Sequence, residues 1–350
     1  MRKNSMRMKA IARPSASVVI AGVVLGLGSL PALAATPANV ETLVIVFKTH
    51  FDIGYTDMAS NVVQRYRTTM IDDALKVVEQ NRDLPPDRQF AWTLPGWPMH
   101  KISEDWPGQT PERKGKILSA LKDGRFAVHA LPFTTHTELL EPEDLVRGLG
   151  YASRLSRAVG LELPRDAKMT DVPCHSWILP TLLKHAGVDF LHLGCNAASS
   201  SPQVPRLFFW EGPDGSRLLT MYTAESYGTG LVPPADWPFK SWLALIHTGD
   251  NHGPPRPEEV KQLLAEAKQK LPGAKVKIGR LSDFADALLA EVHTNQAAGD
   301  SALPTPHSAL DRPRPQPRAT GRGAELRCRD DLLRLREPEE ISRRRHAVSH

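Results

Sequence analysis

Short apolar segments alternate with amphipathic segments through residues 36–296, and this alternation limits the fold more than any other feature of the sequence. Apolar runs of strand length occupy residues 43–47, 88–94, 125–131, 167–172, 189–195, 217–223 and 274–279. Segments with helical spacing lie at residues 61–81, 111–124, 142–160, 176–187, 257–273 and 282–293. Because strands that alternate with helices usually pair in parallel, we expect an α/β fold with a seven-stranded, parallel, barrel-like sheet. A G-x-G-x-x-G motif does not follow the first strand, so a dinucleotide-binding fold is not favoured.

Charge divides the chain into three parts. Residues 1–35 carry a net charge of +5 and residues 301–350 carry +4, while the whole chain carries +5. The central body, residues 36–300, therefore has a net charge of −4. A mildly acidic body gives no reason to expect nucleic acid as a partner.

The first 35 residues have the pattern of a secretory signal peptide. A basic start precedes an apolar run, and the small residues that follow predict cleavage after Ala34 or Ala35. A membrane anchor is the competing interpretation, but the apolar run contains glycines and is shorter than the roughly 20 residues that span a bilayer. We therefore expect an exported bacterial protein, periplasmic or secreted, with no stable membrane anchor.

Residues 297–350 differ in composition from the body of the chain. Arginine and proline are abundant, lysine is absent from residues 301–350, and no apolar run of strand length occurs. One interpretation is a disordered basic tail. The other is an out-of-frame translation, in which case the domain expected over residues 36–296 has lost its continuation.

Three cysteines, Cys174, Cys195 and Cys328, are too few for a disulfide framework and lack the Cys-x-x-Cys spacing of a zinc site. A disulfide between Cys174 and Cys195 is an option in an oxidising compartment. We favour the other option, in which both are small buried side chains.

The segment TLVIVFKTHFDIGYTD, residues 42–57, ends an apolar strand with His50 and Asp52. Side chains two positions apart in a strand point to the same face. In parallel α/β folds, functional groups collect where the strands end. A neutral imidazole and a carboxylate on one face therefore predict half of a site for a divalent cation. The alternative is a hydrogen-bonded pair without a metal.

A second carboxylate, Asp171, lies where the strand predicted at 167–172 ends, four residues before His175. A third, Asp250, lies with Asn251 and His252 in a segment rich in glycine and proline, which is typical of site loops. The alternatives are a helix cap for Asp171 and a plain strand-to-helix connection for Asp250.

A fourth segment, PFTTHTELLEPEDL, follows the strand predicted at 125–131. His136 and Glu138 alternate there as His50 and Asp52 do. The segment forms either a loop on the substrate side or the start of a helix.

These motifs resemble a known family. The segment His50-Phe51-Asp52-Ile53-Gly54-Tyr55 resembles the His-x-Asp-x-Gly-Trp motif of glycoside hydrolase family 38, the zinc-dependent α-mannosidases. The segment 171–176 resembles that family's Asp-Pro-Phe-Gly-His-Ser, and the loop at 249–251 resembles its later Gly-Asp loop. The motifs occur in the family's order, and the resemblance covers about residues 42–293, the family's N-terminal α/β catalytic domain.

The resemblance implies a carbohydrate substrate and a glycosidase that retains anomeric configuration. It implies that His50, Asp52 and Asp171 bind zinc or another divalent cation, which would help to hold the sugar ring in a distorted shape. Asp171 would also be the nucleophile that forms a glycosyl-enzyme, and Asp250 would be the acid/base. Such enzymes need two carboxyl groups roughly 5–5.5 Å apart. Substrate contacts are expected from Tyr55, His136, His175, Asn251 and His252.

The sequence departs from the family pattern in several places. Tyr55 replaces the motif tryptophan, and Pro173-Cys174 replaces Phe-Gly. The family's fourth zinc ligand is a histidine further along the chain, and no matching motif follows residue 293; His252 is the alternative. The family's later domains find no match in the sequence, so a truncated copy with an incomplete site and impaired activity is one expectation.

Three interpretations of function therefore compete. The first is an exported, metal-dependent, retaining glycosidase of the α-mannosidase type. The second is a metal-dependent carbohydrate deacetylase, which would need an H-x-x-x-H helix that residues 36–296 do not contain. The third is an inactive sugar-binding or degenerate family member. The sugar, the linkage and the oligomeric state do not follow from the sequence.

Overall fold

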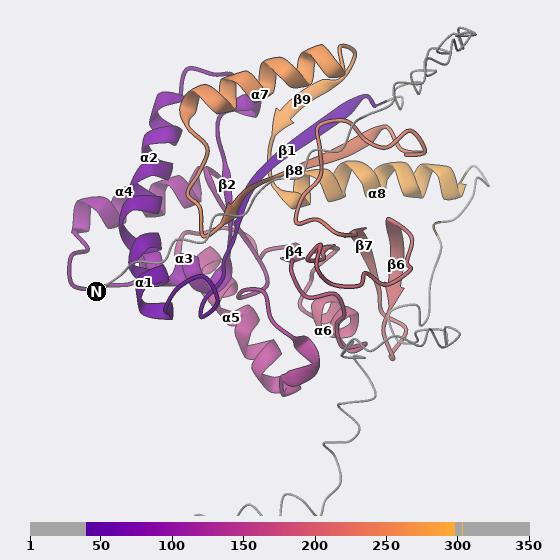
Figure 1. Cartoon of the computed structure of the whole chain (residues 1–350), viewed down its shortest axis with the longest axis horizontal. Helices are drawn as coiled ribbons and strands as arrows, with labels where there is room; N and C mark the ends of the chain where they lie inside the picture. The colour runs from indigo at the N-terminus through magenta and orange to yellow at the C-terminus, as the bar shows by residue number, and fades with distance from the viewer. Residues whose placement is uncertain (1–39, 298–302, 304–350) are drawn as a thin grey trace, which may run out of the picture. The chain divides into compact units, whose positions relative to one another are not determined.

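A computed structural model of the chain describes residues 40–297 and 303, and Figure 1 labels its elements. The strands are β1 (Thr42–His50), β2 (Trp92–Pro95), β3 (Phe126–His129), β4 (Asp166–Met169), β5 (Phe190–Gly194), β6 (Leu207–Glu211), β7 (Arg217–Thr223), β8 (Ser241–Asp250) and β9 (Lys275–Ile278). The α-helices are α1 (Ala59–Arg65), α2 (Ile71–Gln80), α3 (Gly96–Ser103), α4 (Pro111–Lys122), α5 (Pro142–Ala158), α6 (Leu179–His185), α7 (Pro257–Lys270) and α8 (Leu281–Ala297).

The strands form two sheets. In the first, β3, β2, β1 and β8 are neighbours in that order, β9 also pairs with β1, and all pairings are parallel. In the second, the order is β4-β5-β7-β6, and β6 runs antiparallel to β7. The predicted α/β class with mostly parallel pairing is confirmed. The prediction of seven strands, all parallel, is wrong, because β6 and β8 are further strands and β6 reverses direction.

Backbone hydrogen bonds also link the two sheets. The Ala130 N–H, just after β3, donates to the Asp166 carbonyl at 2.8 Å, and the Thr229 N–H, after β7, donates to the Leu245 carbonyl in β8 at 3.0 Å. Closure of the sheets into a barrel stays a prediction.

The first half of β1 is the centre of the larger hydrophobic core. Residues 43–47 are at most 1% exposed. Helix α8 packs against β1 and β8, and α7 packs against β9 (Figure 1). Such a continuous apolar run is what a parallel strand needs when both faces of its sheet are covered.

Helix ends follow local chemistry. At the start of α4, the Thr110 hydroxyl accepts a hydrogen bond from the Arg113 N–H at 3.1 Å, and Pro111 occupies the first turn. After α4, Gly124 has φ +69°, a conformation that glycine adopts without steric cost. These signals confirm the predicted boundaries of this helix.

Other elements differ from the sequence-based expectations. The helix predicted at 61–81 consists of α1 and α2 joined by a π-helical turn, Tyr66–Met70. Helix α3 was not predicted, because eight residues containing a proline give little periodicity. Strand β8 extends through Asp250, which was expected in a loop, because its pairing with β1 continues to that residue.

Some expectations concern residues outside the described part of the chain. The predicted signal peptide, residues 1–35, lies outside it, and so does the predicted tail, residues 297–350, apart from the last residue of α8 and Leu303. Within the described part, no helix combines the length and the apolar character needed to cross a membrane. Cys195 is buried, as expected, whereas Cys174 is half-buried, so the expectation of two buried cysteines holds for Cys195 alone.

Candidate active site

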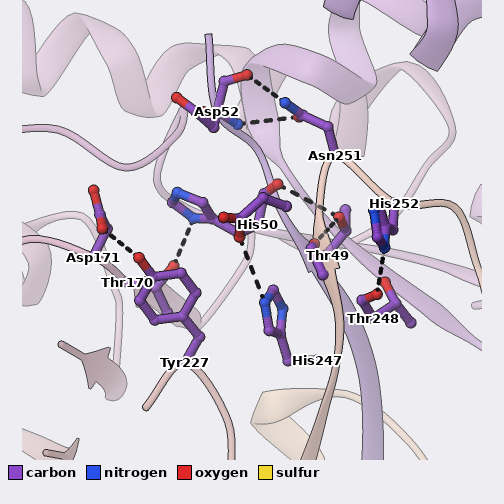
Figure 2. A network of polar contacts seen from close by, with 12 residues as sticks. Thr49, His50, Asp52, Thr170, Asp171, Tyr227, His247, Thr248, Asn251 and His252 are labelled. Carbon is purple, nitrogen blue, oxygen red and sulfur yellow. Dashed lines mark hydrogen bonds and ion pairs between the residues drawn. The ribbon is translucent and has the colours of Figure 1, made fainter. Parts of the chain in front are cut away.

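A cluster of polar side chains surrounds the end of β1 (Figure 2). The pairing of β1 with β8 is regular up to Lys48 and then shifts, so that His50 lies opposite Asp250. The Asn251 N–H donates to the His50 carbonyl at 2.8 Å, and this hydrogen bond holds the end of β1 against the end of β8. Irregular pairing is common beside functional sites because it redirects side chains. Here it brings Asp250 alongside His50.

His50 is buried and held in one orientation. Its Nδ1 lies 3.0 Å from the Thr170 hydroxyl, and its ring centroid lies 5.0 Å from that of Tyr227. Burial, and then the charges of Lys168 and Lys48, lower the pKa of His50 to about 4. The imidazole is therefore neutral at pH 7. With Nδ1–H donating to Thr170, Nε2 keeps a lone pair for a ligand.

Asp171 has a strained backbone and a well-supported carboxylate. Its φ of 81° lies in the region that side chains other than glycine rarely adopt. Its Oδ1 accepts hydrogen bonds from the Tyr227 hydroxyl and from the Asn196 Nδ2, the latter at 2.9 Å. Burial acts to raise the pKa of Asp171, but these two hydrogen bonds, together with the charges of His50 and His136, lower it below its usual value. Asp171 is thus an anion at neutral pH.

Asp52 is held in place by Asn251, the residue that follows β8. The Asn251 Oδ1 accepts from the Asp52 N–H at 3.1 Å, and the Asn251 Nδ2 donates to the Asp52 carbonyl at 2.6 Å (Figure 2). The same amide also donates to the Thr56 hydroxyl at 2.7 Å. On the other side, the Thr56 N–H donates to the Asp52 Oδ2 at 2.9 Å. Asn251 therefore fixes the loop that carries Asp52.

The pKa of Asp250 is shifted in the opposite direction to that of Asp171. Burial, and then the negative charges of Asp52 and Asp171, raise the pKa of Asp250. The His247 Nε2 lies 3.6 Å from Asp250 Oδ1, but burial lowers the pKa of His247 to about 3, so that this ring stays neutral. Two carboxyl groups with opposite pKa shifts on one rim suit an acid and a base.

The expected substrate-contact residues have different environments. Tyr55 is 94% exposed, and His136 and His252 are exposed. His175 is buried, with its Nδ1 3.4 Å from the Thr137 hydroxyl, and burial lowers its pKa to about 3. The side chain of Asn251 is buried and is engaged in the hydrogen bonds described above. Contact with a substrate stays a prediction for all five residues.

One imidazole nitrogen and two carboxylate oxygens of this site are of the kinds that bind divalent cations. The His50 Nε2, the Asp171 Oδ2 and the Asp52 Oδ1 each appear in no hydrogen bond within the described part of the chain. The charges of Asp171 and Asp52 both act on the pKa of His50, so the three groups share one region. Among the described residues, however, no three or more His, Cys, Asp or Glu side chains are already grouped as metal ligands.

Sequence reasoning missed three residues of this site: Thr170, Asn196 and Tyr227. Each follows a strand of the second sheet, namely β4, β5 and β7. The rule that functional groups collect after parallel strands applies to them as well as to His50. They lay outside the family motifs, and single polar residues after strands are too common to select without coordinates.

Comparison with known proteins gives a family match. The model of the glycosyl hydrolases family 38 N-terminal domain matches residues 41–236. No curated protein matches the sequence.

Two solved structures share the fold. An alpha-mannosidase from Enterococcus faecalis V583 has 17% sequence identity and a TM-score of 0.56, and the match covers 72% of this chain and 29% of that one. A protein in glycosyl hydrolase family 38 from Enterococcus faecalis has 14% identity and a TM-score of 0.52, covering 77% of this chain and 29% of that one. The chain thus spans less than a third of the length of these relatives.

Proposed function

Because the chain belongs to glycosyl hydrolase family 38, we propose that it is a metal-dependent, retaining glycosidase that acts on α-mannosides. One observation supports this more than any other. Asp171 is an anion held by two donors, Asp250 lies opposite His50 with a raised pKa, and the charge of Asp171 contributes to that rise. A retaining glycosidase needs this division between a nucleophile and a proton donor.

In the proposed reaction, a carboxylate oxygen of Asp171 forms a bond to the anomeric carbon while the bond to the leaving oxygen breaks. Protonated Asp250 gives its proton to that oxygen. Asp250 then takes a proton from water, the water oxygen displaces Asp171 from the sugar, and both carboxyl groups return to their first state. The hydrogen bonds from Tyr227 and Asn196 to Asp171 Oδ1 orient the carboxylate for the attack.

The residues that would hold a cation are His50, Asp52 and Asp171. Bound there, zinc or another divalent ion would act as a Lewis acid toward sugar hydroxyls. Thr170 orients His50, and Asn251 positions the loop of Asp52. A fourth ligand is not assigned; His252 remains the candidate from the sequence, with its Nδ1 3.1 Å from the Thr248 carbonyl.

The exposed ring of Tyr55 provides a face on which a sugar would stack. We also propose that the mature protein acts outside the cytoplasm, as the signal-like residues 1–35 suggest. Mass spectrometry of protein from the expressing cells tests this: an intact N-terminus would contradict export with cleavage.

The function is tested by incubating the full-length, zinc-loaded protein with p-nitrophenyl α-mannoside and, separately, with an acetylated glycan. We expect release of p-nitrophenol, abolished by a chelator and strongly slowed in Asp250→Asn. Acetate without p-nitrophenol would replace the proposal with a deacetylase. Bound zinc without either product would indicate a sugar-binding or impaired family member.

A further inference from the structure

A layer of basic side chains lies directly beneath the candidate active site. Lys48 precedes His50 by two positions in β1, and Lys168 precedes Thr170 by two positions in β4, so these lysines share strand faces with the site residues above them. His129, at the end of β3, and His192, in β5, complete the layer. All four residues are at most 4% exposed.

The four side chains are close to one another. Lys168 and His192 are partners in the register of β4 and β5. Burial, and then the charges of Lys168 and Lys48, lower the pKa of both His129 and His192 well below the usual value. Each histidine thus lies within electrostatic range of both lysines, although the four residues come from four different strands.

Several nitrogen atoms of this layer lack an acceptor among the described residues. Lys48 Nζ, both ring nitrogens of His129 and the Nδ1 of His192 have no protein hydrogen-bond partner there. The Lys168 amine contacts that of Lys48 and has a long contact of 3.5 Å to the Thr170 hydroxyl, while the His192 Nε2 lies 3.0 Å from the Thr223 hydroxyl. Lys48 lies 5.4 Å from the centre of the Tyr227 ring, and the carboxylate that acts on it electrostatically is that of Asp250, at the rim above. A buried donor without an acceptor destabilises the folded state.

We propose that this layer binds one small, halide-sized anion, such as chloride, between Lys48, Lys168, His129 and His192. One anion would accept hydrogen bonds from several strands at once, and its charge would favour the ammonium form of the two buried lysines. The convergence of side chains from four strands of the interior favours a single atom over a larger oxyanion. This inference does not depend on the proposed glycosidase activity, because no residue of the layer serves there as nucleophile, acid or metal ligand.

The test uses the full-length protein with a chelator present, so that the result does not depend on a bound metal. Thermal unfolding is measured in sodium chloride and in sodium gluconate at equal ionic strength. At a hundredfold excess over its Kd, chloride should raise the Tm by about 5 °C. Lys168→Met should abolish this difference. Lys275→Met, which removes an exposed lysine from β9, should retain it.

Anomalous scattering from crystals grown in bromide provides a second readout that needs no variant. We expect one bromide peak within hydrogen-bond distance of Lys48 Nζ and Lys168 Nζ. Bromide peaks at the surface alone would overturn the proposal, and so would a Tm that is equal in chloride and gluconate.

Discussion

The two halves of β1 have opposite properties. Residues 43–47 are apolar, buried and in regular register with both β8 and β9. Residues 48–50 are polar, equally buried, and coincide with the register shift that places His50 opposite Asp250. One strand therefore combines a segment that stabilises the domain with a segment that positions chemistry.

The difference shows where the domain holds side chains that lower its stability. The apolar half is held by burial on both faces, and its packing supports the polar half, in which neutral His50 and buried Lys48 carry a free-energy cost, as does the strained Asp171 beside it. Costly groups that the surrounding structure holds in place are typical of functional sites. Substitutions in the two halves should therefore separate stability from activity.

The largest effect is expected from Asp171→Asn. This change removes the proposed nucleophile and one proposed metal ligand, and we expect turnover of an α-mannoside to fall by about 10³-fold or more. The free energy of unfolding of the metal-free protein should change little, because the amide keeps much of the shape. Asp236→Asn, at an exposed position, is the matched control. Full activity in Asp171→Asn would contradict the assignment.

Ile45→Ala tests the apolar half. Ile45 is fully buried, and its truncation should lower the free energy of unfolding by about 2–5 kcal/mol in urea denaturation. The metal affinity of the protein that remains folded should be unchanged. A loss of metal affinity with no loss of stability would contradict the division of β1 into two roles.

Thr170→Val tests the polar half with a nearly isosteric change. It removes the hydroxyl beside His50 Nδ1, and we expect a 10- to 100-fold loss of metal affinity in a chelator competition assay. Thr220→Val, at a buried threonine in β7 whose hydroxyl donates to the Leu218 carbonyl, should leave metal affinity unchanged. Equal affinities in the two variants would show that Thr170 does not orient His50.

The smallest effect is a pH dependence of stability in metal-free protein. The pKa is lowered by burial to about 4 for His50 and to about 3 for His175 and His247. Between these values and about 6.5, the unfolded chain binds protons that the folded chain does not, so stability should rise from pH 4 to pH 7. Asp166, whose pKa burial raises to about 6, and Asp250, whose pKa is also raised, act in the opposite direction, but the histidines with lowered pKa, which include His129 and His192, outnumber them. Urea unfolding at several pH values measures this; stability that falls toward pH 7 would contradict it.

The sequence was informative where physical signals are local. Apolar runs predict β1, β5 and β7 closely, and the strand-end rule predicts His50 and Asp171 at one edge of the domain, where the charge of Asp171 acts on the pKa of His50. Both predictions use the spacing of apolar residues, which is read directly from the sequence, and the alignment of parallel strands at one edge of a sheet.

Features that depend on pairing between distant segments were not predictable. The register shift that places Asp250 beside His50 arises only when β1 and β8 pair, about 200 positions apart in sequence. Tyr227 and Asn196 become partners of Asp171 only through the second sheet. The antiparallel direction of β6 likewise depends on the turn between β6 and β7, and the apolar pattern of β6 does not predict that direction.

The most direct test of the account is the position of a bound metal. Crystals of the full-length protein grown with zinc should give one strong anomalous peak at the zinc edge, about 2.0–2.2 Å from His50 Nε2 and from carboxylate oxygens of Asp52 and Asp171. A peak that lacks any of these three residues, or zinc bound only elsewhere on the protein, would contradict the proposed site.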